Sequence, residues 1–345
     1  MVFFTSVWRK VVTVTVTTVT IALGTVGETL AQTLEGAGAS FPAPLYERYF
    51  QQLKKDIGIT VNYNSVGSGA GIEKFIADTV DFAGTDAPPE EAEIEQMLNG
   101  VVMVPTAGGA VAVVYNLPGV SNLKLSQLIL PDIFAGKITK WNDRRIAKDN
   151  PGVDLPDLPI KTVVRADGSG TTFIFTRHLS AANPIFSREV GASRKPKWPG
   201  NPLEGEKNDG VAAFVKETEG AIGYVQDTFA RQNNLSTAML ENLAGQFVEP
   251  TLEEANKALS GLRFYRDFTP ANEANPDEGY PIVGVTWLLV KQSYDNSDTT
   301  MAVKKMVSWI LNQGQNLNNT LEYTRVPEQI ATKILDLVEN QVATK

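Results

Sequence analysis

The chain has 345 residues, of which 43% are hydrophobic and 20% are charged, and its formal net charge is −8. This is the composition of an ordinary globular protein that is long enough for two domains. The acidic balance argues against nucleic acid as a partner, because nucleic acid phosphates are bound by clustered Lys and Arg. The chain has no Cys and a single His, His178, which excludes disulfides, thiolate metal sites and sites built from several imidazoles.

The first 31 residues have the pattern of a secretory signal peptide. Arg9 and Lys10 precede an uncharged stretch at 11–27, and small residues near Ala31 suit cleavage there. A retained membrane anchor is the alternative, but the stretch is short and rich in Thr for a membrane span. Without Cys, no residue could carry a lipoprotein anchor. We therefore expect an exported protein that is cleaved near Ala31 and is not a lipoprotein.

Further along the chain, apolar strand-like runs alternate with amphipathic helix-like segments, which predicts an α/β fold. In chain order, the clearest predicted strands span residues 61–63, 110–115, 162–164, 221–225 and 282–290. The clearest predicted helices span residues 44–55, 71–78, 89–98, 171–179, 210–218, 251–258, 300–311 and 328–339.

Two segments, 105–115 and 280–290, are long apolar runs that contain glycine, as buried central strands do. Between them, residues 117–281 are dense in Pro, Asn, Asp and Gly. A lobe inserted between two crossover strands would give this layout, although strands with glycine also occur in single-domain sheets. The predicted division assigns residues 32–110 plus 283–345 to lobe 1 and residues 111–282 to lobe 2.

Three loops combine glycines with a hydroxyl residue near a helix start: 36–42 (GAGASFP), 67–71 (GSGAG) and 167–172 (DGSGTT). The first turn of a helix presents unpaired backbone N–H groups and a partial positive charge. Glycines let a ligand approach the backbone, and Ser or Thr hydroxyls add donors. For any single loop a plain N-cap is the alternative interpretation. Three such loops in one chain indicate an anion site.

The loops do not match nucleotide-binding motifs. The chain has no GxxxxGK[ST] sequence, and glycines at 67, 69 and 71 lack the GxGxxG spacing of dinucleotide folds. We therefore expect a small anion rather than a nucleotide.

Charged residues accompany the loops. Arg165 lies three residues before Gly168, and a guanidinium is a natural bidentate partner for oxyanion oxygens. Asp167 is close enough in sequence to pair with Arg165, the alternative being a weak surface ion pair. Asp86 follows an apolar stretch and precedes a Pro-initiated segment, where an N-cap is the alternative role.

Four of these segments resemble a known family. The motifs GAGASFPAP at 36–44, YNSVGSGAG at 63–71, DFAGTDAP at 81–88 and VVRADGSGTTFIFT at 163–176 are similar to those of the periplasmic phosphate-binding proteins of bacterial ABC-type phosphate transporters. Supporting similarities occur at 134–143, 208–215 and 220–226. The resemblance implies a two-lobed periplasmic binding protein fold of type II, in which two crossover strands form a hinge.

The resemblance also implies a function. We expect a periplasmic, monomeric protein, without cofactor, metal or enzymatic activity, that binds inorganic phosphate (HPO4/H2PO4) and delivers it to transmembrane permease subunits. Many family members have Thr where Ser40 stands, and some have Ser where Gly69 stands; the second difference removes one minor donor. The implied phosphate-binding residues are Ser40, Phe41 (through its N–H), Ser68, Asp86, Arg165, Ser169, Gly170 (through its N–H) and Thr171, with Asp167 supporting Arg165.

Asp86 offers an explanation for selectivity between phosphate and sulfate. A carboxylate repels an anion unless the ligand offers it a proton, and phosphate keeps a proton near neutral pH whereas sulfate keeps none. With sulfate, two acceptors would face each other away from water, which is unfavourable by several kcal/mol. Our hypothesis is that Asp86 excludes sulfate.

Three alternatives remain. An exported phosphate sensor or scavenger without a permease would need the same site. A phosphotransfer enzyme would need a metal cluster or an activated nucleophile, and His178 lies seven residues beyond Thr171, two turns along the predicted helix. A different oxyanion, such as sulfate or molybdate, is disfavoured by Asp86.

Overall fold

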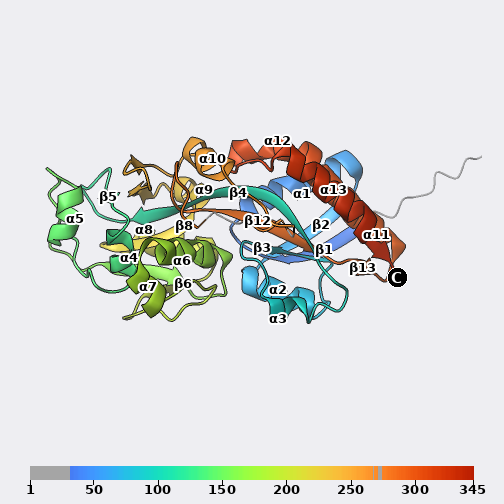
Figure 1. Ribbon diagram of the computed structural model, residues 1–345, viewed down its shortest axis with the longest axis horizontal. Helices are drawn as coiled ribbons and strands as arrows, with labels where there is room; N and C mark the ends of the chain where they lie inside the picture. Colours follow the sequence, from blue (N-terminus) through green and yellow to red (C-terminus); the bar gives the residue numbers. More distant parts are fainter. Residues whose placement is uncertain (1–31, 267, 271–273) are drawn as a thin grey trace, which may run out of the picture. The chain divides into compact units, whose positions relative to one another are not determined.

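In the computed structural model, which describes residues 32–266, 268–270 and 274–345, two long strands form the centre of the main sheet. β4 (Val102–Tyr115) and β12 (Val283–Val290) are buried at every residue and pair antiparallel. β4 pairs with β12 up to Ala110, and from Val111 onward it pairs with β8 (Ala221–Gln226). The chain therefore passes from one lobe to the other within a continuous strand (Figure 1).

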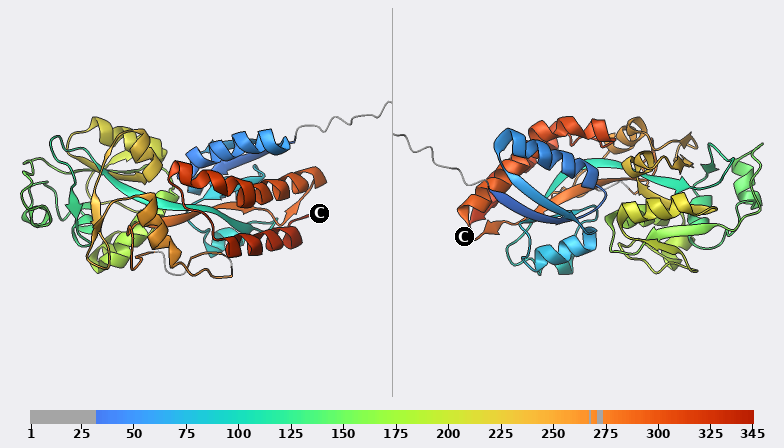
Figure 2. Two further views of the ribbon diagram at one scale, coloured as in Figure 1. Left: turned by 90° about the horizontal axis from the view of Figure 1, so that it is seen from above. Right: turned by 180° about the vertical axis from the view of Figure 1, so that it is seen from behind.

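The first lobe has the strand order β2-β1-β3-β12-β4. β1 is parallel to both β2 and β3, and β12 is antiparallel to β3. Helices α1, α11 and α13 lie on one side of these strands, and α2 and α3 lie on the other (Figures 1 and 2). The bounds are β1 Thr33–Gly38, α1 Ala43–Ile57, β2 Thr60–Ser65, α2 Ser68–Ile76, β3 Phe82–Thr85, α3 Glu91–Ile94, α11 Ser297–Trp309 and α13 Glu328–Gln341.

The second lobe continues the sheet in the order β4-β8-β6-β7, with β9 beside β4. Helices α6 and α8 pack against its strands. The bounds are α4 Ile129–Phe134, α5 Arg144–Asp149, β6 Lys161–Arg165, α6 Gly170–Ala182, α7 Pro184–Glu189, β7 Leu203–Gly205, α8 Lys207–Glu217, α9 Asp227–Gln232, β9 Ser236–Thr237 and α10 Leu252–Ser260. A small separate sheet consists of β5 Lys124–Leu125, β10 Met239–Glu241 and β11 Phe247–Val248. The C-terminal segment adds β13 Ser293–Tyr294, a π-helix Ile310–Gly314, α12 Gln315–Asn318, a 3-10 turn Asn319–Leu321 and β14 Ala343–Thr344.

A tyrosine supports a glycine–hydroxyl loop in each lobe: Tyr63, which is partly buried, and Tyr224, which is fully buried. In the first lobe, the Tyr63 hydroxyl donates to the carbonyl of Ala39 at 2.9 Å, just before α1. In the second lobe, the Tyr224 ring stacks on Phe175 with centroids 4.1 Å apart, and its hydroxyl is 2.7 Å from Thr172 Oγ1 at the start of α6. The core therefore fixes the position of both loops.

Most predicted elements are confirmed, with bounds that differ by a few residues. The helix predicted at 89–98 is wrong, because only Glu91–Ile94 is helical. Ile94 is exposed and Leu98 is 93% exposed, and Met97 is the apolar residue of this stretch that reaches the core, so few apolar contacts stabilise further turns. Gly36 to Gly38 belong to β1 rather than to a loop. The predicted signal peptide, residues 1–31, lies outside the described residues.

Candidate functional site

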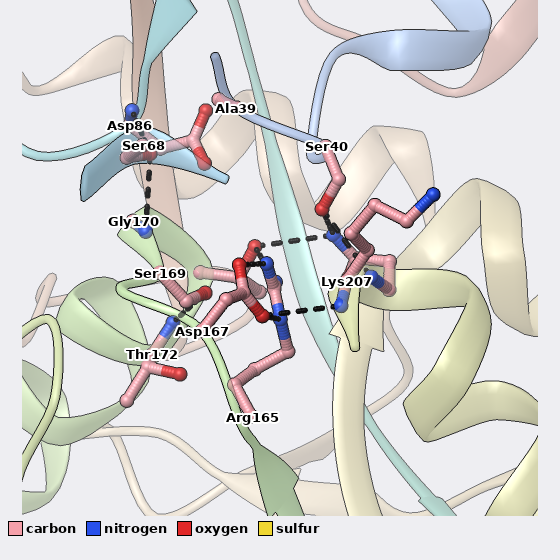
Figure 3. Close-up of polar contacts among 12 residues, drawn as sticks. Ala39, Ser40, Ser68, Asp86, Arg165, Asp167, Ser169, Gly170, Thr172 and Lys207 are labelled. Carbon is pink, nitrogen blue, oxygen red and sulfur yellow. Dashed lines mark hydrogen bonds and ion pairs between the residues drawn. The ribbon is translucent and has the colours of Figure 1, made fainter. Parts of the chain in front are cut away.

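The structure brings predicted residues of both lobes into direct contact at Ser68 (Figure 3). The Ser68 hydroxyl oxygen accepts the N–H of Asp86, from its own lobe, at 3.2 Å. It also accepts the N–H of Gly170, from the second lobe, at 3.1 Å. Next to it, the N–H of Gly69 donates to the carbonyl of Gly168 at 2.8 Å. The two glycine-rich loops therefore lie against each other, and the lobes are closed on the site.

This contact depends on the absence of side chains at two positions. A Cβ at Gly170 would lie 2.6 Å from both Asp86 Cβ and Ser68 Oγ. A Cβ at Gly67, where φ is +91°, would lie 2.1 Å from a carboxylate oxygen of Asp167. The sequence predicted that these glycines let a ligand approach the backbone. In the structure they let the two loops approach each other.

Ser40 is a second point of contact between the lobes. Its hydroxyl oxygen accepts the backbone N–H of Asn208 at 3.2 Å and the side-chain amide of Asn208 at 2.9 Å. Phe41 follows, fully buried, and its carbonyl accepts the Tyr323 hydroxyl at 2.6 Å. The N-cap of α1 is Pro42, without a side-chain capping bond. The Ser40 hydroxyl is therefore engaged across the site and does not cap the helix.

Arg165 and Asp167 form the expected pair, and it is buried. Arg165 Nε and Nη2 donate to the two carboxylate oxygens of Asp167 at 2.7 and 2.5 Å. The side chains are only 2% and 12% exposed, so the surface-pair alternative is wrong. Burial raises the pKa of Asp167, but the bonds from Arg165 outweigh it and hold that pKa below its ordinary value. The N–H of Lys207 also donates to Asp167 at 3.1 Å.

Asp86 is a buried carboxyl in unusual surroundings. Thr286 Oγ1, on β12, donates to its Oδ1 at 2.8 Å. Burial raises the pKa of Asp86 to about 7, against the opposing effects of the Thr286 bond and the Arg165 charge. The N-cap of α3 is Glu90, so the N-cap alternative for Asp86 is wrong. Near neutral pH this group can accept a hydrogen bond when ionised and donate one when protonated.

The start of α6 supplies further donors. Ser169 is the N-cap, and its hydroxyl oxygen accepts the N–H of Thr172 at 3.0 Å, so here the N-cap interpretation is correct. Thr171 is buried, and its Oγ1 is within 3.5 Å of Arg165 Nη1. The first N–H groups of a helix have no intrahelical partner, and they carry its positive dipole end.

Sequence reasoning missed two residues of this site. Asn208 was noticed only as part of a supporting motif, yet it is fully buried and bonds to both Ser40 and Thr171. Thr286 was assigned only to a central strand. Asn208 could have been recognised as a polar residue at the start of an amphipathic helix. Thr286 could not be assigned to the site from the sequence, because its position depends on the pairing of β12 with β3.

Other features bear less directly on the site. His178 is buried on α6 with Nδ1 3.1 Å from the carbonyl of Ala274, and burial lowers its pKa to about 4. Among the described residues, no three His, Asp or Glu side chains are grouped to hold a metal ion. Nor does the described part of the chain contain a helix that is long and apolar enough to cross a membrane. A cavity of about 300 Å³ beside β4 and α10 contains none of the predicted site residues.

The assembled groups have a clear chemical character. Hydroxyls, backbone N–H groups and one guanidinium supply hydrogen-bond donors, and Asp86 is a carboxyl that can accept. Such a set suits a small oxyanion that itself carries a proton.

Comparison with known proteins gives consistent similarities. The sequence model of the PBP superfamily domain matches residues 24–313. The chain is 39% identical to the phosphate-binding protein PstS of Pasteurella multocida over 311 residues, covering 89% of this chain and 90% of that protein. It is 36% identical to the phosphate-binding protein PstS of Haemophilus influenzae over 320 residues, covering 91% and 95%.

Solved structures share the fold. The high-affinity periplasmic phosphate-binding protein PfluDING, bound with phosphate, matches with a TM-score of 0.72 at 21% identity, covering 90% of this chain and 99% of that one. A phosphate-binding protein from Stenotrophomonas maltophilia matches with a TM-score of 0.72 at 19% identity, covering 88% and 93%. At these identities the likeness establishes the two-lobed binding protein fold.

Proposed function

We propose, since this chain belongs to the family of PstS phosphate-binding proteins within the PBP superfamily, that it captures inorganic phosphate between its lobes and delivers it to an ABC-type phosphate permease. The observation that supports this most strongly is the pairing of many donors with one buried carboxyl, Asp86. Phosphate is the common oxyanion that offers both acceptor oxygens and a proton at neutral pH. The proposal therefore accounts for the acceptor as well as for the donors.

In this proposal each lobe supplies part of the phosphate shell. The Arg165 guanidinium, held by Asp167, contributes the positive charge, and closure around it removes water that would weaken each hydrogen bond. A net negative protein can bind an anion this way, because local dipoles and one guanidinium suffice. The proposed ligands are Ser40, Phe41 N–H, Ser68 and Asp86 from the first lobe, and Arg165, Ser169, Gly170 N–H and Thr171 from the second. The Gly170 N–H, which donates to Ser68 in this structure, would exchange that bond for one to phosphate.

We also propose that the site binds without catalysis. An acid–base or nucleophilic role needs a group within reach of the reacting atoms, and His178 instead bonds to a backbone carbonyl. The protein would be exported, cleaved near Ala31 and active in the periplasm as a monomer. We also propose that the lobes divide between residues 110 and 111 and between residues 282 and 283. The support for this division is that β4 changes its pairing partner after Ala110.

Calorimetric titration of the purified protein, freed of bound ligand, tests the function. We expect one-to-one phosphate binding and much weaker binding of sulfate. Asp86→Asn should weaken phosphate binding by about 10- to 100-fold and admit sulfate, since the acceptor facing the ligand proton is removed. Asp227→Asn is the matched control, because Asp227 is also buried but pairs with Arg231 and is not among the proposed ligands.

The outcomes separate two claims. A native protein without affinity for phosphate, or with equal affinity for sulfate, would show that the proposed function is wrong. An Asp86→Asn variant that still rejects sulfate would show that selectivity lies elsewhere.

A further inference from the structure

Asn208 is a fully buried amide at the first turn of α8, in contact with groups from both lobes. Its Nδ2 is 2.9 Å from Ser40 Oγ in the first lobe and 3.3 Å from Thr171 Oγ1 in the second. Its Oδ1 accepts the backbone N–H of Gln226 at 2.9 Å. A backbone N–H can only donate, so the atom that faces Gln226 must be the oxygen. The amide nitrogen is thereby fixed toward the two hydroxyls.

The count of hydrogen bonds at Ser40 determines what its hydroxyl can do. A hydroxyl has two acceptor positions and one hydrogen. Asn208 fills both acceptor positions of Ser40 Oγ, one with its backbone N–H at 3.2 Å and one with Nδ2. The remaining hydrogen has to be donated to another partner. With the lobes closed, Ser40 is thus held as a donor.

The same reasoning applies to Thr171. Its Oγ1 receives Asn208 Nδ2 and, at 3.5 Å, Arg165 Nη1. Both donors lie on the protein side, so the Thr171 hydrogen is also free to point to a ligand oxygen. One amide therefore sets the hydrogen direction of a hydroxyl in each lobe.

We propose that Asn208 is a positioning residue for phosphate, which holds the Ser40 and Thr171 hydroxyls as hydrogen-bond donors to the bound anion. This inference rests on the proposed function. Asn208 acts through the two hydroxyls and is not itself a ligand. It also joins the lobes through Ser40, so the donors reach this arrangement only when the lobes are closed.

Asn208→Asp tests the proposal with a side chain of almost the same shape. The oxygen that replaces Nδ2 would accept the hydrogens of Ser40 and Thr171 and withdraw both donors from phosphate. We expect phosphate affinity at pH 8 to fall by about 100-fold, as for the loss of two hydrogen bonds to a charged ligand. At pH 5 the introduced carboxyl group, once protonated, has one hydrogen and can donate to one of the two hydroxyls, whereas the amide donates to both. We therefore expect the loss to shrink to about tenfold.

The native protein is titrated at both pH values as well. The result at each pH is the ratio of the variant's phosphate affinity to the native protein's phosphate affinity at that pH. This ratio cancels the ionisation of phosphate, of Asp86, and of the Arg165–Asp167 pair that faces Thr171 and the start of α8. Asn242→Asp is the matched control, because Asn242 is a buried amide that bonds to Gly279 and Gln246. It should bind phosphate like the native protein at both pH values.

A mutant cycle covers the case in which Asn208→Asp does not fold. Asn208→Ala should weaken phosphate binding by about tenfold in the native background and by about twofold or less in a Ser40→Ala, Thr171→Val background, since there are no hydroxyls left to orient. An equal loss in both backgrounds, or an Asn208→Asp loss independent of pH, would overturn the proposal. A native protein that binds no phosphate would instead overturn the proposed function, so the two failures are distinguishable.

Discussion

The guanidinium of Arg194 lies 2.6 Å from the carboxylate of Glu93. Arg194 belongs to the segment between α7 and β7 in the second lobe, whereas Glu93 belongs to α3 in the first. The backbone carbonyl of Arg194 also accepts the N–H of Ser169 at 2.9 Å. A single residue therefore connects the loop that begins α6 with the opposite lobe.

Replacement of Arg194 should loosen the closed state. Its side chain is 14% exposed, so the ion pair is largely shielded from water and salt. We expect Arg194→Gln to increase the rate of phosphate dissociation by about 5- to 30-fold, corresponding to about 1–2 kcal/mol for a partly buried charged hydrogen bond. Stopped-flow measurement of phosphate release would check this.

The control for that experiment is Arg188→Gln. Arg188 is 74% exposed, and its contact with Glu189, at 3.9 Å, stays within α7. Its loss should leave phosphate release unchanged. If both variants release phosphate at the native rate, the Arg194–Glu93 pair does not contribute to closure.

Sulfate binding should depend on pH in a direction set by Asp86. Burial raises the pKa of Asp86 to about 7, so the carboxyl is ionised at pH 8 and protonated at pH 5. A protonated Asp86 offers sulfate a donor, so apparent sulfate affinity should rise about tenfold from pH 8 to pH 5, following the protonated fraction. Calorimetric titrations at the two pH values measure it. In Asp86→Asn the pH effect should disappear; a sulfate affinity that rises with pH in the native protein would contradict this explanation.

Gly170→Ala should impair binding without impairing folding. The added Cβ would lie 2.6 Å from Asp86 Cβ, across the contact between the lobes. Alanine is favoured over glycine in a helix by up to about 1 kcal/mol, so α6 itself is not weakened. We expect phosphate affinity to fall at least about tenfold, while the unfolding temperature of the ligand-free protein changes little. Gly261→Ala, where an added Cβ meets no atom within 4 Å, is the control and should bind normally. Equal affinities in the two variants would show that the lobes do not need this close approach.

His178 should make the folded state sensitive to acid. Burial lowers its pKa to about 4, below the value of about 6.5 in the unfolded chain. Between these two values the unfolded chain binds a proton that the folded chain does not, so stability falls as the pH drops from 6.5 to 4. Compared with His178→Asn, the native protein should lose up to about 3 kcal/mol of unfolding free energy over this range. Urea denaturation at several pH values would measure it, and parallel curves for the two proteins would show that His178 does not titrate as expected.

The sequence predicted much of this site because its parts are local. The pairing of Arg165 with Asp167 needs only two residues of separation, and a glycine–hydroxyl loop before a helix is visible in a short window. The resemblance then supplied the residues that we propose as ligands of one bound anion. Helices such as α5 and α9 were not predicted, because six residues are too few for an apolar period to appear.

Other features depend on contacts between distant parts of the chain. Asp86 meets Thr286, which is 200 positions away, only because β12 runs beside β3. Ser40 and Asn208 are 168 positions apart and meet because the two lobes lie against each other. No local pattern contains such pairs, and the raised pKa of Asp86 follows from burial that the sequence does not report.

The continuity of β4 has a practical consequence for dissecting the protein. Up to Ala110 this strand completes the sheet of one lobe, and from Val111 it completes the sheet of the other. A fragment that ends at this boundary would expose an unpaired strand edge in each half, and such edges promote aggregation. The two lobes are therefore poorly suited to expression as separate pieces, and a reporter inserted to follow closure belongs in a surface loop rather than within β4.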